Sequence, residues 1–312
     1  IRDLVRSRGL GDVYKRQPST VATVAYSPDG RRLAAACGDS LALWDPDTGQ
    51  EVLNLALEPR GAYEIPMAFS SDSQTLAVAT SGILLVDVAS GLEAVSLPSR
   101  GEPKSFAWSL DGALLAIAYD DGCDVVRLSV GQVIAHIATR EVTHVAFEDE
   151  RTLVVASCIA LVRYPFDPEG AVMEGAPPSP SPEAFAPVAY RLARIADGWL
   201  ADGGDEGALE VYAFRTLEPL RTLTLPPLVN RRYLSATASG ESFAIAAEDA
   251  ELSLRRIFVF DSRSGDVRQD VDLYAHTDYG GPNIRSLAFR PGVPQMAIAA
   301  GDEVLVWLPL LE

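Results

Sequence analysis

The chain has 312 residues and a formal net charge of −17, with 48% hydrophobic and 22% charged residues. This apolar content can bury a sizeable core, so the composition excludes intrinsic disorder as the default state. Nucleic acid and anionic membranes would both repel so acidic a chain, and we expect neither as a partner. No apolar run approaches the ~18 residues of a membrane-spanning helix, so we expect no transmembrane segment.

The first segment, residues 1–17, differs from the rest in composition. It holds Lys15, one of only two lysines in the chain. The stretch DVYKRQ at residues 12–17 can be encoded by a sequence that resembles the mosaic end of transposon-based sequencing libraries. We therefore predict that residues 1–17 are a non-native leader and that the native N-terminus is missing. The alternative is a genuine basic N-terminal arm.

From residue 21 onward one plan recurs seven times. Residues 21–55 contain four short apolar runs joined by a Pro-Asp-Gly turn, by Gly38-Asp39 and by an Asp-Thr-Gly turn. Such turn residues preset the backbone of tight turns, so each copy predicts four antiparallel strands, which at ~40–45 residues is the size of a propeller blade. We therefore predict an all-β, seven-bladed β-propeller. Its blades are predicted at residues 21–57, 62–99, 103–139, 141–177, 188–225, 231–276 and 283–311.

Two recurring positions fix the register of the copies. An aromatic residue precedes the first turn at Tyr26, Phe69, Trp108, Phe147 and Phe289. The end of the third strand is occupied by Trp44, Val86, Arg127, Arg163, Tyr212, Phe260 and Trp307. An aspartate follows that position at Asp45, Asp87 and Asp261.

The stretch SPDGRRLAAACGDSLALWD at residues 27–45 resembles a repeat of the WD-repeat β-propeller family. The resemblance extends from residue 21 to the C-terminus, although individual repeats are degenerate and the Gly-His pair that opens many family repeats is absent. The family builds a buried hydrogen-bonded network from a His, an Asp in the turn before the third strand, and the Trp. The resemblance implies that the last blade keeps this network as His276, Asp302 and Trp307. The first blade keeps Asp39 and Trp44.

Two departures from the regular plan follow. The stretch EGAPPSPSPEAFAP at residues 174–187 is dense in Pro and Ser, which predicts an extended insertion between two blades, a flexible flap or a PxxP-type ligand motif. The seventh blade ends at its third strand, EVLVW at residues 303–307. Family members take the missing outer strand from the N-terminus, so we predict that this blade lacks a native outer strand or is closed by a makeshift one.

Residues with catalytic or metal-binding potential are few. His136 and His144 alternate with apolar residues in predicted strands, and no nucleophile–base, metal-ligand or phosphate-loop motif is present. Acidic runs such as Glu148-Asp149-Glu150 fall in turns, where we expect solvated charge. Three cysteines lie in apolar runs, which predicts buried free thiols, a reducing compartment and a cytoplasmic location. The three are Cys37, Cys123 and Cys158. We predict no catalytic residue, no metal and no cofactor.

The candidate binding residues lie in the loops that lead from the fourth strand of a blade into the next blade. Such loops share one face of a propeller, and here they gather arginines, whose guanidinium groups pair with carboxylate or phosphate. Arginine with tyrosine is also typical of interface anchors. The predicted partner-binding residues are Arg60, Tyr63, Arg100, Lys104, Arg140, Arg231, Arg232 and Tyr233.

These observations favour a non-catalytic interaction module that binds a protein or peptide partner, which we expect to be acidic. The bacterial propellers that the chain resembles are often fused to kinases or NTPases, so an upstream signalling domain is part of this expectation. The alternative is a ligand-binding or enzymatic propeller of the lactonase-like or quinoprotein-like groups. Those resemblances would imply metal-ligating carboxylates or histidines that converge at the channel.

Overall fold

The computed structural model describes residues 10–14, 20–58, 65–168, 184–186, 191–202, 208–224, 229–236, 239–248, 254–272 and 284–307. Within these ranges only the backbone is described at residues 10–14, 93–94, 184–186, 208, 229–232, 247–248, 254–255 and 272. The described residues contain no helix long and apolar enough to cross a membrane.

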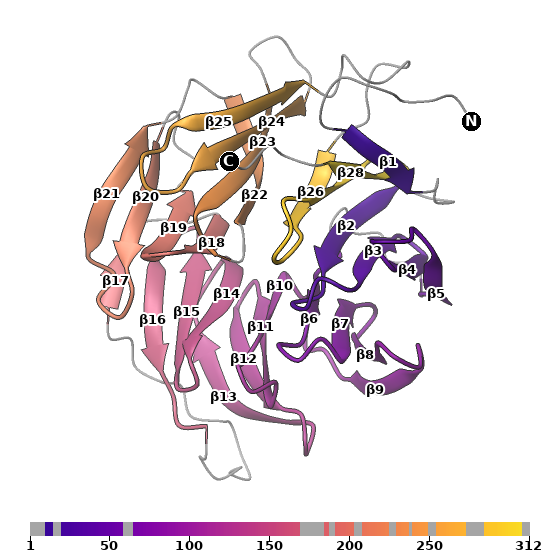
Figure 1. The fold of residues 1–312 in the computed structure, drawn as a ribbon. Coiled ribbons are helices and arrows are strands. Elements are labelled where there is room, and N and C mark those ends of the chain that lie inside the picture. Colours follow the sequence, from indigo (N-terminus) through magenta and orange to yellow (C-terminus); the bar gives the residue numbers. More distant parts are fainter. Residues whose placement is uncertain are drawn as a thin grey trace.

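The described strands form seven sheets of four antiparallel strands, arranged around a common centre (Figure 1). Blade 1 consists of β2 (Val21–Tyr26), β3 (Leu33–Cys37), β4 (Ser40–Trp44) and β5 (Glu51–Ala56). Blade 2 consists of β6 (Met67–Phe69), β7 (Thr75–Ala79), β8 (Ile83–Asp87) and β9 (Glu93–Leu97). Blade 3 consists of β10 (Ser105–Trp108), β11 (Leu114–Tyr119), β12 (Gly122–Arg127) and β13 (Gln132–Ala138).

Blade 4 consists of β14 (Val142–Asp149), β15 (Thr152–Ser157), β16 (Leu161–Pro165) and β17 (Ala184–Ala186). Blade 5 consists of β18 (Arg191–Ile195), β19 (Gly198–Asp202), β20 (Ala208–Ala213) and β21 (Pro219–Thr224). Blade 6 consists of β22 (Val229–Ala236), β23 (Ser242–Glu248), β24 (Leu254–Asp261) and β25 (Val267–Asp272). Blade 7 consists of β26 (Ile284–Phe289), β27 (Met296–Ala300), β28 (Glu303–Trp307) and β1 (Leu10–Tyr14). The predicted seven-bladed propeller is confirmed.

The outer strands of two blades lie outside the predicted blade boundaries: that of blade 7 comes from the N-terminal segment, and that of blade 4 from the Pro/Ser-rich segment. In blade 7, β1 pairs with β28, with Leu10 opposite Trp307 and Val13 opposite Leu305. Residues of the predicted leader thus close the ring as a makeshift strand would, and the non-native origin of residues 1–17 stays a prediction. In blade 4, the outer strand is β17, which lies inside the segment 174–187 that we predicted to be an insertion between blades.

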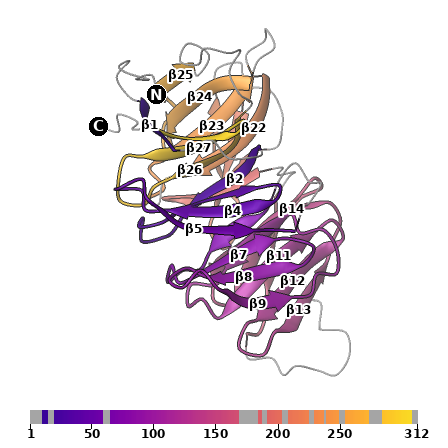
Figure 2. The ribbon, with the colours of Figure 1, turned by 90° about the vertical axis from the view of Figure 1, so that its right-hand side faces the viewer.

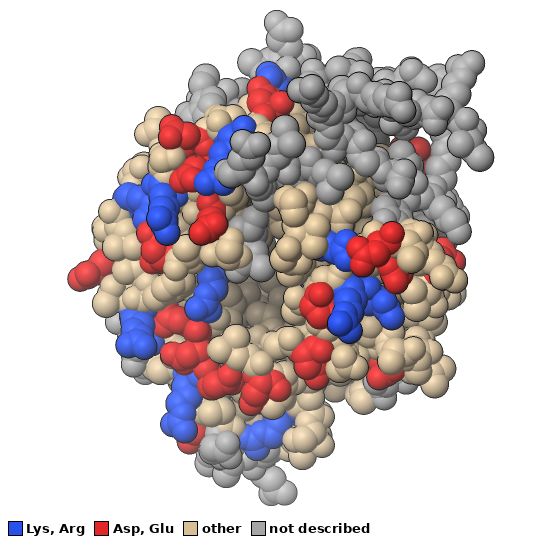
Figure 3. All heavy atoms as spheres, in the orientation of Figure 1, with Lys and Arg blue, Asp and Glu red and all other residues tan. Residues whose placement is uncertain are grey.

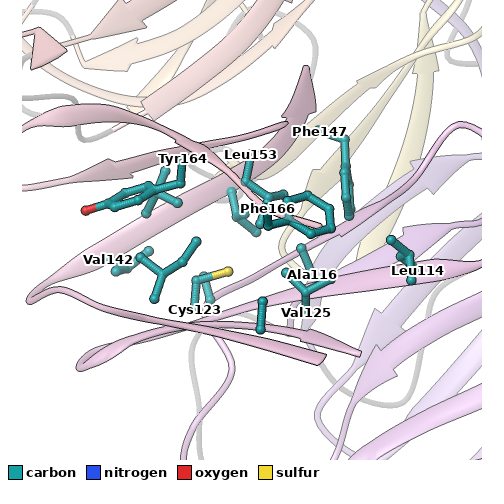
Figure 4. Packing of buried hydrophobic residues seen from close by; sticks show 14 of the residues in the cluster. Leu114, Ala116, Cys123, Val125, Val142, Phe147, Leu153, Tyr164 and Phe166 are labelled. Atoms are coloured by element: carbon teal, nitrogen blue, oxygen red, sulfur yellow. The ribbon is translucent and has the colours of Figure 1, made fainter. Parts of the chain in front are cut away.

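Each blade packs against its two neighbours through a cluster of buried side chains. There are seven such clusters among the described residues, and each joins two adjacent blades. Figure 4 shows the cluster between blades 3 and 4, where Cys123 and Val125 face Val142 and Tyr164. A four-stranded sheet buries both faces only in this way, so the second and third strands are apolar almost throughout.

The cysteines follow this packing in part. Cys37 and Cys123 are buried free thiols, as predicted, and burial raises the pKa of the Cys123 thiol well above its usual range. The prediction was wrong for Cys158, which is only half-buried because it lies in the turn between β15 and β16. Burial is again the largest reason why the pKa of its thiol is raised.

The inner strands are held close together at the centre of the disc. Each inner strand contacts the inner strand of the next blade, so the seven contacts form a closed ring. One register position of every inner strand holds a small residue, because neighbouring sheets converge there and leave little room. These residues are Ala25, Ala68, Ala107, Ala146, Ala193, Ser235 and Ala288.

The outer strands share a second regular feature. In blades 1, 2, 5 and 6 the register of the outer strand shifts one residue after the pair that closes the turn, and in blade 3 it shifts two residues after that pair. Such a bulge twists an edge strand and interrupts its free hydrogen-bonding row, which opposes pairing with a further strand. The residues without a register partner are Val52, Ala94, Ile134, Leu220 and Arg268.

The ring of small residues predicts how the inner strands respond to added volume. We expect Ala107→Leu to destabilise the fold by about 1–3 kcal/mol, because the site between blades 3 and 4 is already filled. The matched control is Ala56→Leu on the exposed side of β5, which should leave the stability unchanged. Urea unfolding of both variants measures the difference, and equal stabilities would contradict a closely packed ring.

Candidate functional site

The connections of the propeller fall on two faces. Because the strands of a blade alternate in direction, the second-to-third-strand turns lie on the same face as the connections from one blade to the next. We call this the loop face. The first-to-second-strand and third-to-fourth-strand turns lie on the opposite face, which we call the turn face. The predicted arginine-bearing loops belong to the loop face, whose described parts include residues 98–104 and 139–141.

Arg100 is held inside blade 3. Its Nε donates to Asp124 Oδ2 at 2.9 Å, it also pairs with Asp121, and its guanidinium carbon lies 4.3 Å from the centre of the Tyr119 ring. Asp124 is buried and also contacts His136 Nδ1 at 2.6 Å. Partial burial opposes the charge of Arg100, but its hydrogen bonds to the two aspartates raise its pKa overall. Arg100 therefore fixes a loop to its own blade.

The pairing of Arg100 with Asp121 joins the connection that enters blade 3 to the turn before its third strand. His136 is a strand residue with a carboxylate partner, as its alternation predicted. Lys104 lies in the same loop, with its Nζ 3.5 Å from Asp120 and 3.9 Å from Glu102, so it too faces carboxylates of its own blade.

Arg140, like Arg100 and Lys104, is exposed. Its neighbour Glu141 has a φ of 56° and is held on both sides by backbone hydrogen bonds. The Glu141 N–H donates to Asp120 O at 2.6 Å, and the Glu141 carbonyl accepts from the Cys158 N–H at 3.1 Å. These bonds bring the β13–β14 loop against the β15–β16 turn, whose tip residue Ile159 is 59% exposed. An exposed arginine and an exposed apolar residue thus lie in two loops that are joined by a backbone hydrogen bond.

Ile159 is a site residue that the sequence analysis missed. The other described turns before third strands carry Gly, Asp, Ser or Thr at their tips, for example Gly38-Asp39 and Asp120-Asp121. An isoleucine at this turn position was the available signal, but Ile159 lies within a longer apolar run in the sequence and reads there as part of a strand.

The remaining predicted binding residues fall elsewhere. Arg60 and Tyr63 lie outside the described residues. Arg231, Arg232 and Tyr233 were predicted in a loop, but they belong to the inner strand β22. The strand starts early because a bulge between Val229 and Tyr233 keeps it paired with β23. Tyr233 is half-buried and packs against the cluster between blades 6 and 7.

The residues of the implied family network are placed as follows. Trp44 and Trp307 are buried, in the clusters on either side of blade 7. Asp39 lies in the turn before β4, where its carbonyl accepts from the Leu57 N–H at 2.8 Å. Asp302 lies in the turn before β28. His276 lies outside the described residues, so the network in blade 7 stays a prediction.

On the turn face, one aspartate organises the third-to-fourth-strand turn in three blades. Asp45 accepts from the backbone N–H groups of residues 47 and 48, and Asp87 from that of Ser90. Asp261 accepts from the N–H groups of residues 263 and 264 at 2.8 and 2.9 Å. The aspartate that follows the third strand in the sequence pattern is therefore a turn-forming residue.

The first-to-second-strand turns of the turn face link consecutive blades. In blades 1 to 3, a serine hydroxyl donates to the aspartate two residues later at 2.6 Å. The Asp29 N–H donates to Ser73 Oγ at 3.0 Å, and Ser71 Oγ donates to the Ser109 carbonyl at 2.7 Å. In blade 7 the equivalent residue is Arg290, whose Nε donates to the Gly30 carbonyl at 2.8 Å. These bonds hold neighbouring blades in register.

Glu148 makes the corresponding link between blades 4 and 5. It is buried, and its carboxylate accepts from Arg163 Nε and from the Arg215 N–H, both at 2.7 Å, and from Trp199 Nε1 at 3.4 Å. The expectation of solvated charge was wrong for this residue, because Glu148 occupies the position that serine holds in blades 1 to 3. On the face shown in Figure 3, basic side chains likewise lie next to acidic ones around a central hollow.

No group of three or more His, Cys, Asp or Glu residues in the part of the chain that the structure describes could hold a metal ion. His136 and Glu148, which the sequence analysis singled out, and the buried strand residue Asp124 are each engaged with other side chains of the blades.

Comparisons with known proteins agree with this architecture. Residues 12–45 match the family model described as "WD domain, G-beta repeat", which confirms the resemblance for this repeat. The match begins at residue 12, inside the predicted leader. No curated protein matches the chain. A solved structure described as "Structure of U3-55K" has a TM-score of 0.75 and 14% identity, over 96% of this chain and 98% of that one. At that identity the likeness shows the fold alone.

The buried carboxylate of Glu148 predicts a large loss of stability on truncation. We expect Glu148→Ala to destabilise the fold by about 3–5 kcal/mol, because it removes a buried carboxylate that accepts from Arg163 Nε, the Arg215 N–H and Trp199 Nε1. Glu241→Ala, at an exposed turn position, is the control and should have little effect. A Glu148→Ala variant as stable as the control in urea would show that Glu148 does not link the blades.

The turn aspartates predict a loss of stability in acid. Hydrogen bonds from the Ser264 amide, and the charge of Arg268, lower the pKa of Asp261 from 3.8 to about 2. A carboxyl whose pKa is lower in the folded state contributes stability above its unfolded pKa and loses it as the pH falls through the folded pKa. The unfolding free energy should therefore fall between about pH 4 and pH 2, and less steeply in Asp261→Asn. Parallel pH profiles for the two proteins would contradict this.

Proposed function

We propose that the chain is a non-catalytic interaction module that binds a protein or peptide partner on its loop face. The blades use their sheet faces to pack against one another, which leaves the loops and the outer edges to meet a partner. The observation that carries the proposal is that Arg140 and Ile159 are both exposed, on two loops that backbone hydrogen bonds hold together. Arginine is among the residue types that are enriched in interface hot spots.

The partner's chemistry follows from these two side chains. A guanidinium group pairs best with a carboxylate or phosphate, and Ile159 needs an apolar side chain to cover it. We therefore propose an acidic segment that also carries apolar residues. Arg60, Tyr63, Arg231 and Arg232 remain part of this proposal as further contacts on the partner. Fusion to an upstream signalling domain remains part of it as well.

Arg100 and Lys104 take a different role in the proposal. Their charges face Asp121, Asp124 and Asp120 of blade 3, so they shape the loop rather than meet the partner directly. Arg100→Glu would place three carboxylates together and should lower the thermal stability of the fold. Arg140→Glu should not, because Arg140 is exposed and exposed ion pairs contribute only ~0–1 kcal/mol.

A synthetic peptide of alternating Glu and Leu residues tests the loop face. We expect saturable binding in fluorescence polarisation, and at least a tenfold loss of affinity in the double variant Arg140→Glu with Ile159→Ser, about 1.4 kcal/mol or more. Arg263→Glu on the turn face is the matched control and should bind as the unmodified chain does. The double variant should unfold at the unmodified temperature. Equal affinity in the double variant, or no saturable binding by the unmodified chain, would refute the proposal.

A further inference from the structure

The outer edge of blades 1 to 3 carries a concentration of exposed apolar side chains. Scattered exposed apolar residues are ordinary on a protein surface, but a contiguous group marks a surface that something covers. Half of the large apolar side chains that the described residues expose lie on this edge, in β5, β9 and β13 or in the turns that lead into them. They are Val52, Leu92, Val95, Val130 and Val133. We call this group the apolar rim.

The members of the rim are brought together because each turn overlies the outer strand of the preceding blade. A Cβ on Gly91 would clash with the Leu53 side chain, so the turn that carries Leu92 sits directly on β5. A Cβ on Gly131 would lie 3.7 Å from Leu97 Cδ2, so the turn that carries Val130 lies on β9. Figure 2 shows β5, β9 and β13 in succession on the side of the disc turned to the viewer.

The charge around the rim is negative. Blade 2, the middle of the three, contains no Lys, Arg or His between residues 65 and 97 and has three acidic residues there. Hydrogen bonds from Ser90 hold the pKa of Asp87 below its usual range, and the Thr48 amide does the same for Asp45 in blade 1. Both carboxylates are therefore ionised at neutral pH. In blade 3, the Arg127 guanidinium donates to the Pro168 carbonyl of blade 4.

The backbone of the rim does not favour a partner that adds a strand. Each of the three outer strands has a bulge close to its first residue, which interrupts the row of hydrogen-bonding groups that an added strand would need. A second copy of this chain is also disfavoured, because its own rim would bring the same negative charge. What fits an apolar strip bordered by carboxylates is a helix with an apolar stripe flanked by Lys and Arg.

We propose that the apolar rim of blades 1 to 3 is a second docking surface, and that its occupant is a basic amphipathic helix of a partner protein. The proposal is independent of the loop face, which lies at the ends of the strands and has the opposite preference in charge. One propeller would then hold an acidic segment on its face and a basic helix on its edge.

A synthetic Leu/Lys peptide, patterned to form an amphipathic helix, tests the rim. The test variant is Leu92→Ser with Val130→Ser, at positions 69% and 55% exposed, where the fold should tolerate serine. The matched control is Leu220→Ser with Val267→Ser, at positions 49% and 40% exposed on the same edge of blades 5 and 6. We expect the test variant to lose affinity at least tenfold and the control to bind as the unmodified chain does. Added salt should weaken binding to the unmodified chain.

Three results would overturn the proposal. The first is equal affinity of the test variant and the unmodified chain, or no saturable binding at all. The second is equal binding of a peptide with the same composition in scrambled order, which would show charge attraction alone. The third is a dimer of the unmodified chain in light scattering that the test variant abolishes, since the occupant would then be a second copy. Arg140→Glu with Ile159→Ser should leave Leu/Lys binding unchanged, so failure of the loop face and failure of the rim are distinguishable.

Discussion

The structure depends on one constraint: a four-stranded sheet set on edge can bury its two faces only against neighbouring sheets. Seven clusters of buried side chains, one at each junction between blades, satisfy that constraint all the way round the ring. The sheets converge toward the centre, which explains the small residue at one register position of every inner strand. They diverge toward the edge, where turns such as 89–92 and 129–131 fill the widening gap by lying over the preceding blade.

Polar groups add a second layer of coupling between blades, and they are concentrated on the turn face. Serine and aspartate turns, Glu148 and Arg290 each form a bond that crosses a blade junction. The arginines of the loop face are divided between two roles. Arg100 pairs with aspartates of its own blade, while Arg140 is the arginine that we propose contacts a partner. Polar side chains that bond within or between blades stabilise the ring, and the remaining exposed side chains are available to a partner.

The sequence predicted the fold well because every copy of the repeat carries its own signals. Turn residues such as Asp45 and Gly49 act on neighbours two to four positions away, so their effect can be read locally. The candidate site was less predictable, because it depends on distant partners. Glu148 accepts a hydrogen bond from the backbone N–H of Arg215, 67 residues away, and Arg100 donates to Asp124, 24 residues away. No local pattern in the sequence predicts which loop arginine pairs with such a distant carboxylate.

The central claim is that the ring is one mechanical unit whose blades share their cores, which is what makes its loops and edges fixed platforms for partners. Native-state hydrogen exchange under increasing denaturant tests this most directly, because it reports the opening free energy of each segment. We expect the second strands to open together, with one common free energy; they are β3, β7, β11, β15, β19, β23 and β27. A blade or group of blades that opens at a lower free energy than the rest would contradict it.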